Sequence, residues 1–207
     1  MGTVKSLLLG MCFVLGACTS QTSTVQTTEK GTQWEWQNGT IVVKTPERPA
    51  GQKSVLGLTT PKLEAVRVGF VGLGMRGPGA VERLTYIPGT QVVALCDYEE
   101  ARADKCQELL KKASMPKAAV YSGDKGYEEL CKRDDIDLVY VAADWLHHFP
   151  VAKCALENGK NVAIEVPSAM NLQECWDLIN LSESTRKHCF ILENCCYDSV
   201  SYTHLRA

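Results

Sequence analysis

Short apolar runs alternate with amphipathic stretches from Ala65 onward. The runs are rich in β-branched residues, as buried strands are, and the stretches between them have the spacing of helices that bury one face. The strands are expected over residues 66–71, 91–96, 119–121, 138–142, 161–166 and 189–192. The helices are expected over residues 78–84, 99–113, 126–132, 150–158 and 172–186. This alternation predicts an α/β fold in which βαβ units form a doubly wound parallel sheet of the Rossmann type.

Two of the expected helices carry start signals in the sequence. Pro78 suits the first position of a helix, where the missing N–H costs nothing. Asn171, with Glu174 three residues later, has the spacing of a capping box. These signals predict helices that begin close to residues 78 and 172.

Residues 1–17 have the features of a signal peptide. Lys5 precedes an apolar stretch, Ser6 to Ala17, that is too short to span a bilayer. The ending Leu15-Gly16-Ala17-Cys18 is similar to the bacterial lipobox, which implies a lipid anchor on Cys18. We therefore expect a membrane-anchored lipoprotein of the bacterial cell envelope, on the periplasmic or surface side. A plain secretory signal with an incidental cysteine is the alternative.

Residues 18–62 are expected to form a tether and an irregular leader. Thr19 to Lys30 is polar and has few apolar side chains to bury. Residues 31–62 contain Trp34 and Trp36 and are expected to lie against the domain surface without regular structure. Asn38-Gly39 within them is interpreted as an ordinary turn. The globular domain is therefore expected over residues 63–198.

Composition narrows the classes of partner. The chain has 207 residues and a net charge of −2, with 45% hydrophobic and 22% charged residues, which suits one globular domain with extensions. Because no basic cluster is present, nucleic acid is not an expected partner. The cysteines lack CxxC spacing, so no zinc site is expected. Those inside the domain are expected to act as small hydrophobes, namely Cys96, Cys106, Cys131, Cys154, Cys175, Cys189, Cys195 and Cys196.

A glycine-rich motif follows the first strand of the domain. Gly72, Gly74 and Gly77 form a GxGxxG pattern between the strand that ends at Val71 and the helix expected at Pro78. In this context the first glycine makes the turn, the second lets the backbone approach a pyrophosphate, and the third permits close helix packing. The N-terminus of the helix then faces the phosphates. The motif predicts a dinucleotide site.

Asp97 ends the second expected strand. An acidic side chain at this place accepts hydrogen bonds from the hydroxyls of the adenosine ribose, and its charge repels a 2′-phosphate. NAD is therefore favoured over NADP, although Arg76 in the loop complicates that choice. The alternative role for Asp97 is to cap the following helix.

Three polar clusters follow later strands: Asp144 to His148, Glu165 to Pro167, and Glu193-Asn194. The carboxyl ends of parallel strands share one edge of the sheet, and ligands of open α/β sheets bind there. His147 and His148 do not have the spacing of metal ligands. We expect all three clusters to lie beside the dinucleotide.

These motifs together carry a family resemblance. The runs Val66–Gly77, Asp144-Trp145, Glu165-Val166-Pro167 and Leu192–Tyr197 resemble glycoside hydrolase family 109, within the glucose-fructose oxidoreductase and inositol dehydrogenase superfamily. The resemblance implies a set of contacts with NAD. These are Met75, Arg76, Asp97, Trp145, Leu146, His147, His148, Glu165, Val166 and Asn194.

The activity that the resemblance implies is hydrolysis of terminal α-N-acetylgalactosamine. NAD accepts a hydride from the sugar C3, elimination releases the aglycone, water adds and the hydride returns, which is the NAD-dependent exception among glycosidases. Dehydrogenases of the superfamily usually have a lysine where this chain has Val166, so the resemblance argues against an ordinary dehydrogenase. A sugar dehydrogenase and a non-catalytic NAD-binding protein, with oligomers possible for each, stay open as alternatives.

The resemblance also implies a C-terminal α+β substrate domain that carries the catalytic residues. The present chain is too short to hold it, so we expect a fragment that is inactive alone. Residues 199–207 show no strand or helix pattern, and Val200 to Ala207 back-translates to a sequence that resembles a transposase adapter. We therefore expect a non-native tail after Asp198, with a natural variable tail as the alternative.

Overall fold

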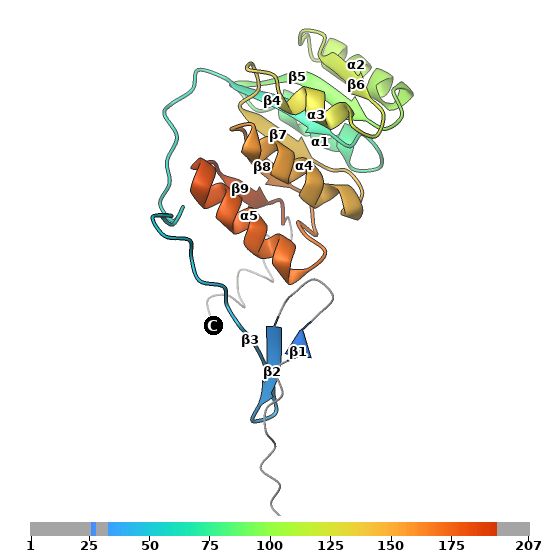
Figure 1. Ribbon diagram of the computed structural model, residues 1–207. Coiled ribbons are helices and arrows are strands. Elements are labelled where there is room, and N and C mark those ends of the chain that lie inside the picture. The colour runs from blue at the N-terminus through green and yellow to red at the C-terminus, as the bar shows by residue number, and fades with distance from the viewer. Residues whose placement is uncertain (1–25, 28–32, 194–207) are drawn as a thin grey trace, which may run out of the picture. The chain divides into compact units, whose positions relative to one another are not determined.

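The computed structural model describes residues 26–27 and 33–193, which divide into two compact units, Met1–Lys44 and Thr45–Ala207 (Figure 1). Cys18, Asn194 and the tail at 199–207 lie outside the described residues. Within the part that is described, no helix combines the length and apolar character needed to cross a membrane.

The second unit is built on a parallel sheet of six strands. The strands are β4 (Val66–Val71), β5 (Thr90–Asp97), β6 (Ala119–Ser122), β7 (Leu138–Val141), β8 (Asn161–Ile164) and β9 (Cys189–Ile191). Their order is β6-β5-β4-β7-β8-β9, and every neighbouring pair is parallel. The chain therefore moves outward from β4 to one edge and then from β7 to the other. This confirms the doubly wound Rossmann sheet and places its switch point between β4 and β7.

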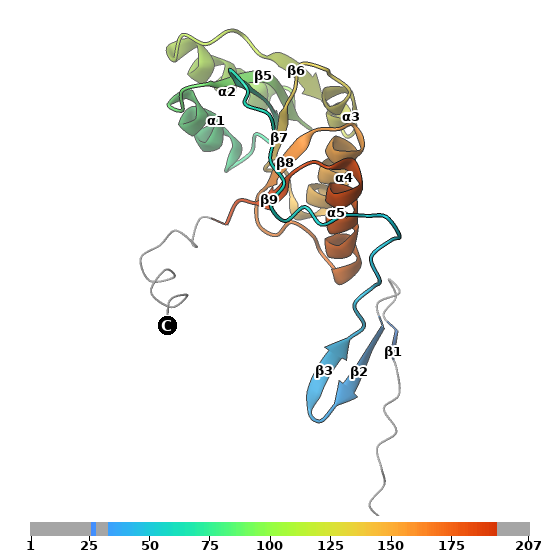
Figure 2. The same cartoon turned by 90° about the vertical axis from the view of Figure 1, so that its left-hand side faces the viewer.

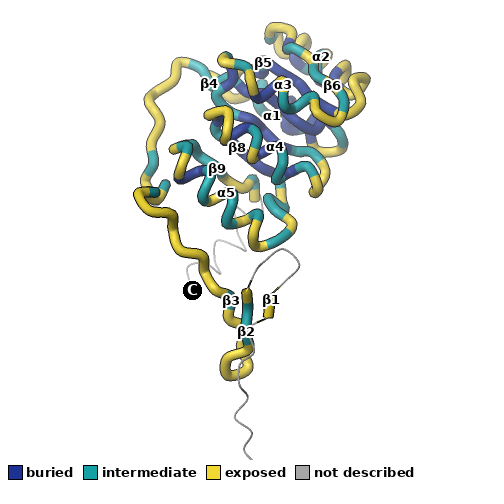
Figure 3. Tube along the Cα trace, viewed as in Figure 1, coloured by how far each residue is buried: buried dark blue, intermediate teal, exposed yellow. Residues whose placement is uncertain are grey.

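Helices cover the two faces of this sheet. They are α1 (Gly77–Thr85), α2 (Ala101–Lys112), α3 (Gly126–Cys131), α4 (Trp145–Glu157) and α5 (Leu172–Thr185). Figure 2 shows α1 and α2 on one face and α3, α4 and α5 on the other. Each group closes its own apolar core, one around Phe70 and Leu95 and the other around Val139 and Ile164 (Figure 3). The central strands β4, β5, β7 and β8 are mostly buried between these cores, as their continuous apolar runs predict, whereas the edge strands β6 and β9 are partly exposed.

The capping box of α5 is confirmed. Asn171 Oδ1 accepts a hydrogen bond of 3.1 Å from the Glu174 N–H, and Glu174 Oε2 accepts one of 2.7 Å from the Met170 N–H. The glutamate therefore accepts a hydrogen bond from the backbone N–H of the residue before the cap. Pro78 lies in the first turn of α1, also as predicted.

Helix α4 begins earlier than the sequence predicts. We expected it from Pro150, but it starts at Trp145, where Asp144 Oδ1 accepts a bond of 2.9 Å from the Leu146 N–H. Pro150 lies inside the helix and removes only one backbone bond near its start. Strand β8 likewise ends at Ile164 rather than Val166. His147 and His148 consequently lie on the first helical turns, where α4 fixes their directions.

In the first unit, regular structure replaces the irregular chain that we predicted. Strands β2 (Gln33–Gln37) and β3 (Thr40–Val43) form an antiparallel hairpin, and β1 (Gln26–Thr27), within the expected tether, pairs with β2. Asn38 and Gly39 both have positive φ, at 50° and 79°, as a tight hairpin turn requires. Alternation in this short run places Trp34 and Trp36 on one face, with ring centroids 6.4 Å apart.

The rest of the leader, after residue 44, has no helix or strand and binds to α5, as predicted. Arg48 Nε and Nη2 donate to the two oxygens of Glu183 at 2.8 and 2.9 Å, and Gln52 Nε2 donates to the same carboxylate at 2.9 Å. These bonds hold the pKa of Glu183 below its usual value. The buried carboxylate of Glu183 thus fixes the leader on the outer side of α5.

Candidate functional site

The loop between β4 and α1 has room for glycine alone at two of its three motif positions. Gly72 has a φ of +95°, and a Cβ there would lie 2.3 Å from the backbone of Ala142 and Ala143. A Cβ at Gly77 would lie 2.3 Å from the Gly72 carbonyl oxygen. Gly72 thus lets the loop turn against the end of β7, and Gly77 lets α1 pack against the turn.

Gly74 differs from its two neighbours because protein does not fill the space beside it. The nearest atom to a Cβ at this position is Arg102 Nη1, at 3.6 Å. The backbone of Gly74 therefore faces the cleft directly, as a residue that must approach a pyrophosphate does. The turn at Gly72 and the close packing at Gly77 are as predicted, and the contact of Gly74 with a pyrophosphate stays a prediction.

The N-terminus of α1 faces the same space. Arg76 occupies the capping position, no side chain caps the helix, and no acidic residue lies in its first turn. The first N–H groups of a helix carry partial positive charge and bind anions. The loop and the helix thus form a phosphate cradle.

Asp97, at the end of β5, is buried next to this cradle, with 6% of its surface exposed. Its Oδ2 accepts a hydrogen bond of 2.7 Å from the Leu73 N–H, and its Oδ1 accepts one of 3.0 Å from the Glu99 N–H. Helix α2 begins at Ala101 with Glu100 in the capping position, so Asp97 is not its cap. The carboxylate instead ties the phosphate loop to the end of β5.

A cleft of about 1040 Å³ runs along the carboxyl edge of the sheet at the switch point. The predicted residues that line it are Gly72, Gly74, Met75, Arg76, Asp97, Trp145, Leu146, His147, His148, Glu165 and Val166. Gly77 lies behind the loop, and Asn194 lies outside the described residues. Motifs that are far apart in the sequence are thus brought to one site. The volume suits a dinucleotide-sized ligand.

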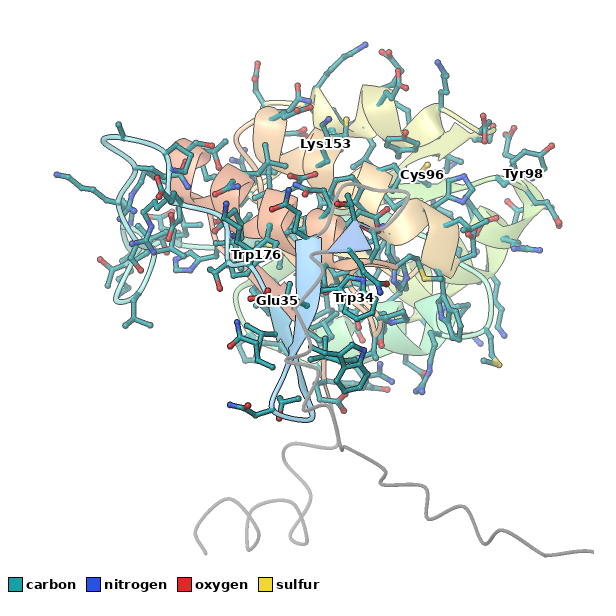
Figure 4. The ribbon with its side chains drawn as sticks, turned by 60° about the horizontal axis from the view of Figure 1, so that its bottom comes forward. Trp34, Glu35, Cys96, Tyr98, Lys153 and Trp176 are labelled. Atoms are coloured by element: carbon teal, nitrogen blue, oxygen red, sulfur yellow. The ribbon has the colours of Figure 1, made fainter. Side chains whose placement is uncertain are left out.

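Four side chains of the cleft were missed by the sequence analysis: Tyr98, Arg102, Asp124 and Tyr127. Figure 4 labels Cys96 and Tyr98 at the end of β5, where Tyr98 is 73% exposed. Arg102 lies on the first turn of α2, and its Nη1 approaches Asp97 Oδ1 at 3.3 Å. Its position five residues after Asp97 was the available signal, because that spacing returns a helical side chain to the strand end.

The first turns of α4 place two histidines in different surroundings. His147 is partly exposed, and its Nδ1 lies 2.6 Å from Asp144 Oδ2. Burial is the largest single effect and opposes ionisation of Asp144, but the bond to His147, the charge of His147 and the backbone N–H groups of Leu146 and His147 together outweigh it and lower the pKa of the carboxyl. His148 is 1% exposed, with Nδ1 2.6 Å from the Pro167 carbonyl and Nε2 2.9 Å from the Ala143 carbonyl. His148 thus joins the segment after β7 to the segment after β8.

Glu165 and Val166 follow β8 on the opposite wall. The Glu165 N–H donates to the Val141 carbonyl at 2.9 Å, and Glu165 Oε1 accepts a bond of 3.1 Å from the Tyr140 hydroxyl. Burial, and then the charge of Glu165, raise the pKa of Tyr140 to about 12, so the phenol remains a donor. Val166 is 45% exposed and presents an apolar side chain to the cleft.

The cysteines of the described domain are all free. Cys96, Cys106 and Cys131 are buried and fill the cores as predicted, whereas Cys175 is exposed on α5, so its assignment to the core was wrong. Burial, and then the charge of Asp97, raise the pKa of Cys96 to about 12, so its thiol at the cleft is not a nucleophile. Among the described residues, no group of His, Cys, Asp and Glu has the geometry of a metal site.

Comparison with known proteins agrees with this geometry. Residues 66–192 match the family described as "Oxidoreductase family, NAD-binding Rossmann fold". The crystal structure of myo-inositol dehydrogenase from Lactobacillus casei, in complex with NAD(H) and myo-inositol, is 26% identical and superposes with a TM-score of 0.57. That similarity covers 65% of this chain and 38% of the dehydrogenase.

The curated relatives bear the name that the motifs suggested. Glycosyl hydrolase family 109 protein 4 of Phocaeicola vulgatus is 79% identical over 199 residues, which are 96% of this chain and 39% of that protein. Glycosyl hydrolase family 109 protein 1 of Bacteroides thetaiotaomicron is 56% identical over 98% of this chain and 42% of its own length. The chain thus spans about two fifths of the length of these relatives. It belongs to the oxidoreductase family with an NAD-binding Rossmann fold, its cofactor is NAD, and the resemblance to glycosyl hydrolase family 109 is confirmed.

Proposed function

We propose that this chain is the cofactor domain of an NAD-dependent glycosidase that releases terminal α-N-acetylgalactosamine from glycans. The observation that carries the proposal is the 79% identity, over 96% of the chain, to a family 109 protein. Such identity supports the same construction of the cofactor site in the two proteins. The α-N-acetylgalactosamine specificity follows from the activity described for the family.

Different residues of the cleft bind different parts of NAD. The backbone of Gly74, Met75 and Arg76 binds the pyrophosphate at the N-terminus of α1, and Asp97 binds the adenosine ribose. The walls formed by Trp145–His148 and Glu165-Val166 would enclose the nicotinamide half. Bound in this way, NAD supplies a hydride acceptor that returns the hydride within one catalytic cycle.

The sugar is held and its protons are moved by residues of the second domain that the resemblance implies. Val166 supports hydrolysis rather than net oxidation, because a valine cannot transfer a proton at a sugar hydroxyl as the superfamily's lysine does. Its exposed side chain instead excludes water from that part of the cleft.

The decisive experiment uses the full gene product with a chromogenic α-N-acetylgalactosaminide in ²H₂O. Release of the aglycone, deuterium at the sugar C2 and no net NADH are expected, because elimination removes the C2 proton and the hydride returns. A Val166→Lys variant is the matched control: it restores the residue typical of the dehydrogenases and should lower the rate of aglycone release. Aglycone release without C2 exchange would refute the proposed mechanism.

The fold similarity to myo-inositol dehydrogenase favours one competing function, a sugar dehydrogenase. Net NADH formation from free N-acetylgalactosamine, without aglycone release, would establish it. Tight NAD binding without turnover of either substrate would instead indicate a non-catalytic nucleotide-binding protein. The same two assays therefore separate the three functions.

We further propose that the protein is attached to the bacterial cell envelope by a lipid on Cys18, with glycans as its partners outside the cytoplasm. The signal-like residues 1–17 and the Leu-Gly-Ala-Cys ending support this location. Metabolic labelling with a fatty acid should mark the wild-type protein and not a Cys18→Ser variant. Equal labelling of both would exclude the anchor.

A further inference from the structure

Asp97 has less capacity for a ribose than its place in the motif implies. A carboxylate has about four acceptor positions. Leu73 N–H occupies one on Oδ2, while Glu99 N–H and Arg102 Nη1 both approach Oδ1. About one acceptor position remains, on the side of Oδ2. With Arg102 in this place, Asp97 can therefore accept one ribose hydroxyl and not two.

Arg102 is built into the corner of the cleft that receives this ribose. Its Nη1 lies 3.3 Å from Asp97 Oδ1, and its Nη2 lies 2.9 Å from Glu99 Oε1. The same Nη1 is the nearest atom to the open side of Gly74, at 3.6 Å from the Cβ position. The side chain is 45% exposed and lines the cleft. The guanidinium thus spans the gap between the phosphate loop and the buried carboxylate.

The two side chains favour opposite ligands. An acidic residue after the second strand selects the free 2′-hydroxyl of NAD, and a nearby arginine accommodates the 2′-phosphate of NADP. A guanidinium has five N–H donors in a fork that fits phosphate, and two of them make the contacts with Asp97 and Glu99. The ion pair also partly neutralises the carboxylate that would repel a 2′-phosphate.

We propose that Arg102 broadens the nucleotide specificity of this site. It gives the ribose corner a second binding mode, for a nucleotide with a 2′-phosphate, while Asp97 maintains the preference for NAD. The protein therefore binds NADP as well as NAD, with lower affinity. This inference rests on the cofactor site and not on the proposed sugar chemistry.

Arg76 is the other arginine of the cleft and provides the matched control. It lies at the N-terminus of α1, beside the position of the pyrophosphate. NAD and NADP share the pyrophosphate and differ only at the 2′ position. Loss of Arg76 should consequently weaken both nucleotides by the same factor, whereas loss of Arg102 should weaken NADP without weakening NAD.

The test is calorimetric titration of the nucleotide-free protein with NAD and with NADP, for wild type, Arg102→Met and Arg76→Met. Arg102→Met should weaken NADP binding by about tenfold, the value of one charged hydrogen bond to phosphate, and should not weaken NAD binding, because an acceptor position on Asp97 becomes free for the second ribose hydroxyl. Arg102→Lys should fall between wild type and Arg102→Met. Equal effects of Arg102→Met on both nucleotides, or an unchanged ratio of affinities, would overturn the proposal.

A second measurement needs no variant and covers the case in which Arg102→Met does not fold. Adenosine 2′,5′-bisphosphate and 5′-AMP differ only in the 2′-phosphate, and both should bind to the wild-type protein. Binding of the bisphosphate should weaken more steeply with added salt, because it uses an additional ion pair. If 5′-AMP and NAD bind but neither 2′-phosphorylated nucleotide does, the role of Arg102 is excluded and the NAD site stands. If no nucleotide binds, the cofactor assignment fails with it.

Discussion

The amino ends of the parallel strands form one edge of the sheet and their carboxyl ends form the other. The two edges differ in how their polar groups are used. At the amino edge, polar groups are paired within the protein. Arg67 Nη2 and Nε donate to the two oxygens of Asp137 at 2.7 and 2.9 Å, and the Arg67 N–H donates to the same carboxylate. Asn161 Nδ2 donates to the Asp137 carbonyl, and Asn161 Oδ1 accepts from the His188 N–H. This edge is closed by its own residues.

The carboxyl edge keeps donors and open space for a ligand. Gly74 has no protein atom within ordinary contact distance except Arg102, and the N-terminus of α1 has no side-chain cap. Asp97 and His148 make hydrogen bonds across this edge, and both join segments that line the cleft. A sheet can thus derive stability from one edge and function from the other. Variants at the two edges should therefore differ in whether they change folding, cofactor binding or both.

The largest effect is expected at Gly72, which is needed both for folding and for cofactor binding. Gly72→Ala places a Cβ 2.3 Å from backbone atoms at the end of β7, in a backbone conformation that alanine avoids. Neither segment can move without disrupting the sheet, so the free energy of unfolding should fall by about 4 kcal/mol. NAD binding should be lost as well. Urea unfolding and calorimetry measure the two effects.

Gly74→Val tests whether the neighbouring glycine serves only the ligand. Its side chain enters space that protein does not fill, so stability should change by less than about 1 kcal/mol. NAD retention should nevertheless be abolished, because valine occupies the position of the pyrophosphate. Unchanged cofactor content in purified Gly74→Val would contradict the assignment of this loop.

The second largest effect is expected at His148. His148→Phe fits the buried volume but removes the ring nitrogens that lie against the carbonyls of Ala143 and Pro167. Loss of the hydrogen bond that the ring N–H donates should lower the free energy of unfolding by about 2 kcal/mol. The Glu165-Val166 wall should shift with Pro167, so NAD should also bind more weakly. His147→Phe, on the exposed side of the same turn, is the matched control and should change stability by less than about 0.5 kcal/mol.

A smaller effect, confined to folding, is expected at the amino edge. Asp137→Asn removes the charge that pairs with Arg67 but keeps a side chain of the same size. Because the pair is partly exposed, the free energy of unfolding should fall by only about 1 kcal/mol. NAD affinity should be unchanged, since Asp137 lies at the edge away from the cleft. Weaker NAD binding by Asp137→Asn would show that the two edges are coupled.

The sequence could predict features that depend on the local pattern of residues, but not contacts between side chains of distant segments. The βαβ alternation and the three glycines determine backbone shape directly, so the sheet, the loop and the cleft could be predicted from them. The Arg67–Asp137 pair joins a residue of β4 to the residue before β7, and nothing in the local pattern of either segment indicates it. Asp97 was placed correctly, but its bonds to Leu73 and Arg102 depend on side-chain directions that strand spacing does not specify.

Two further features, the hairpin and the start of α4, were not predicted because each depends on a short segment. The hairpin at residues 33–43 is too short for its alternation to stand out from an irregular leader. The early start of α4 depends on Asp144 as a cap, which was obscured by the more conspicuous Pro150. In both cases one short segment determined the structure: the turn at Asn38-Gly39 formed the hairpin, and the cap at Asp144 set the start of α4. Patterns that extend over many residues were more informative than single residues.

The smallest predicted effect is a dependence of the free energy of unfolding on pH that comes from Asp137 at the amino edge and leaves cofactor binding unchanged. The bond from Arg67 holds the pKa of Asp137 below its usual value, so the folded state binds this proton less readily than the unfolded state. The stabilisation from Asp137 is therefore complete above the unfolded pKa of about 4 and is lost as pH falls through the folded pKa.

Wild type and Asp137→Asn should accordingly differ in free energy of unfolding by a constant amount at about pH 7 and pH 5, and by less at about pH 3. Taking this difference removes the contribution of the other carboxyl groups, which titrate in both proteins. Gly74→Val serves as the control, since it changes no titratable group and its difference from wild type should not follow the titration of Asp137. A difference between wild type and Asp137→Asn that stays constant down to about pH 3 would mean that size and hydrogen bonding, rather than charge, close the amino edge.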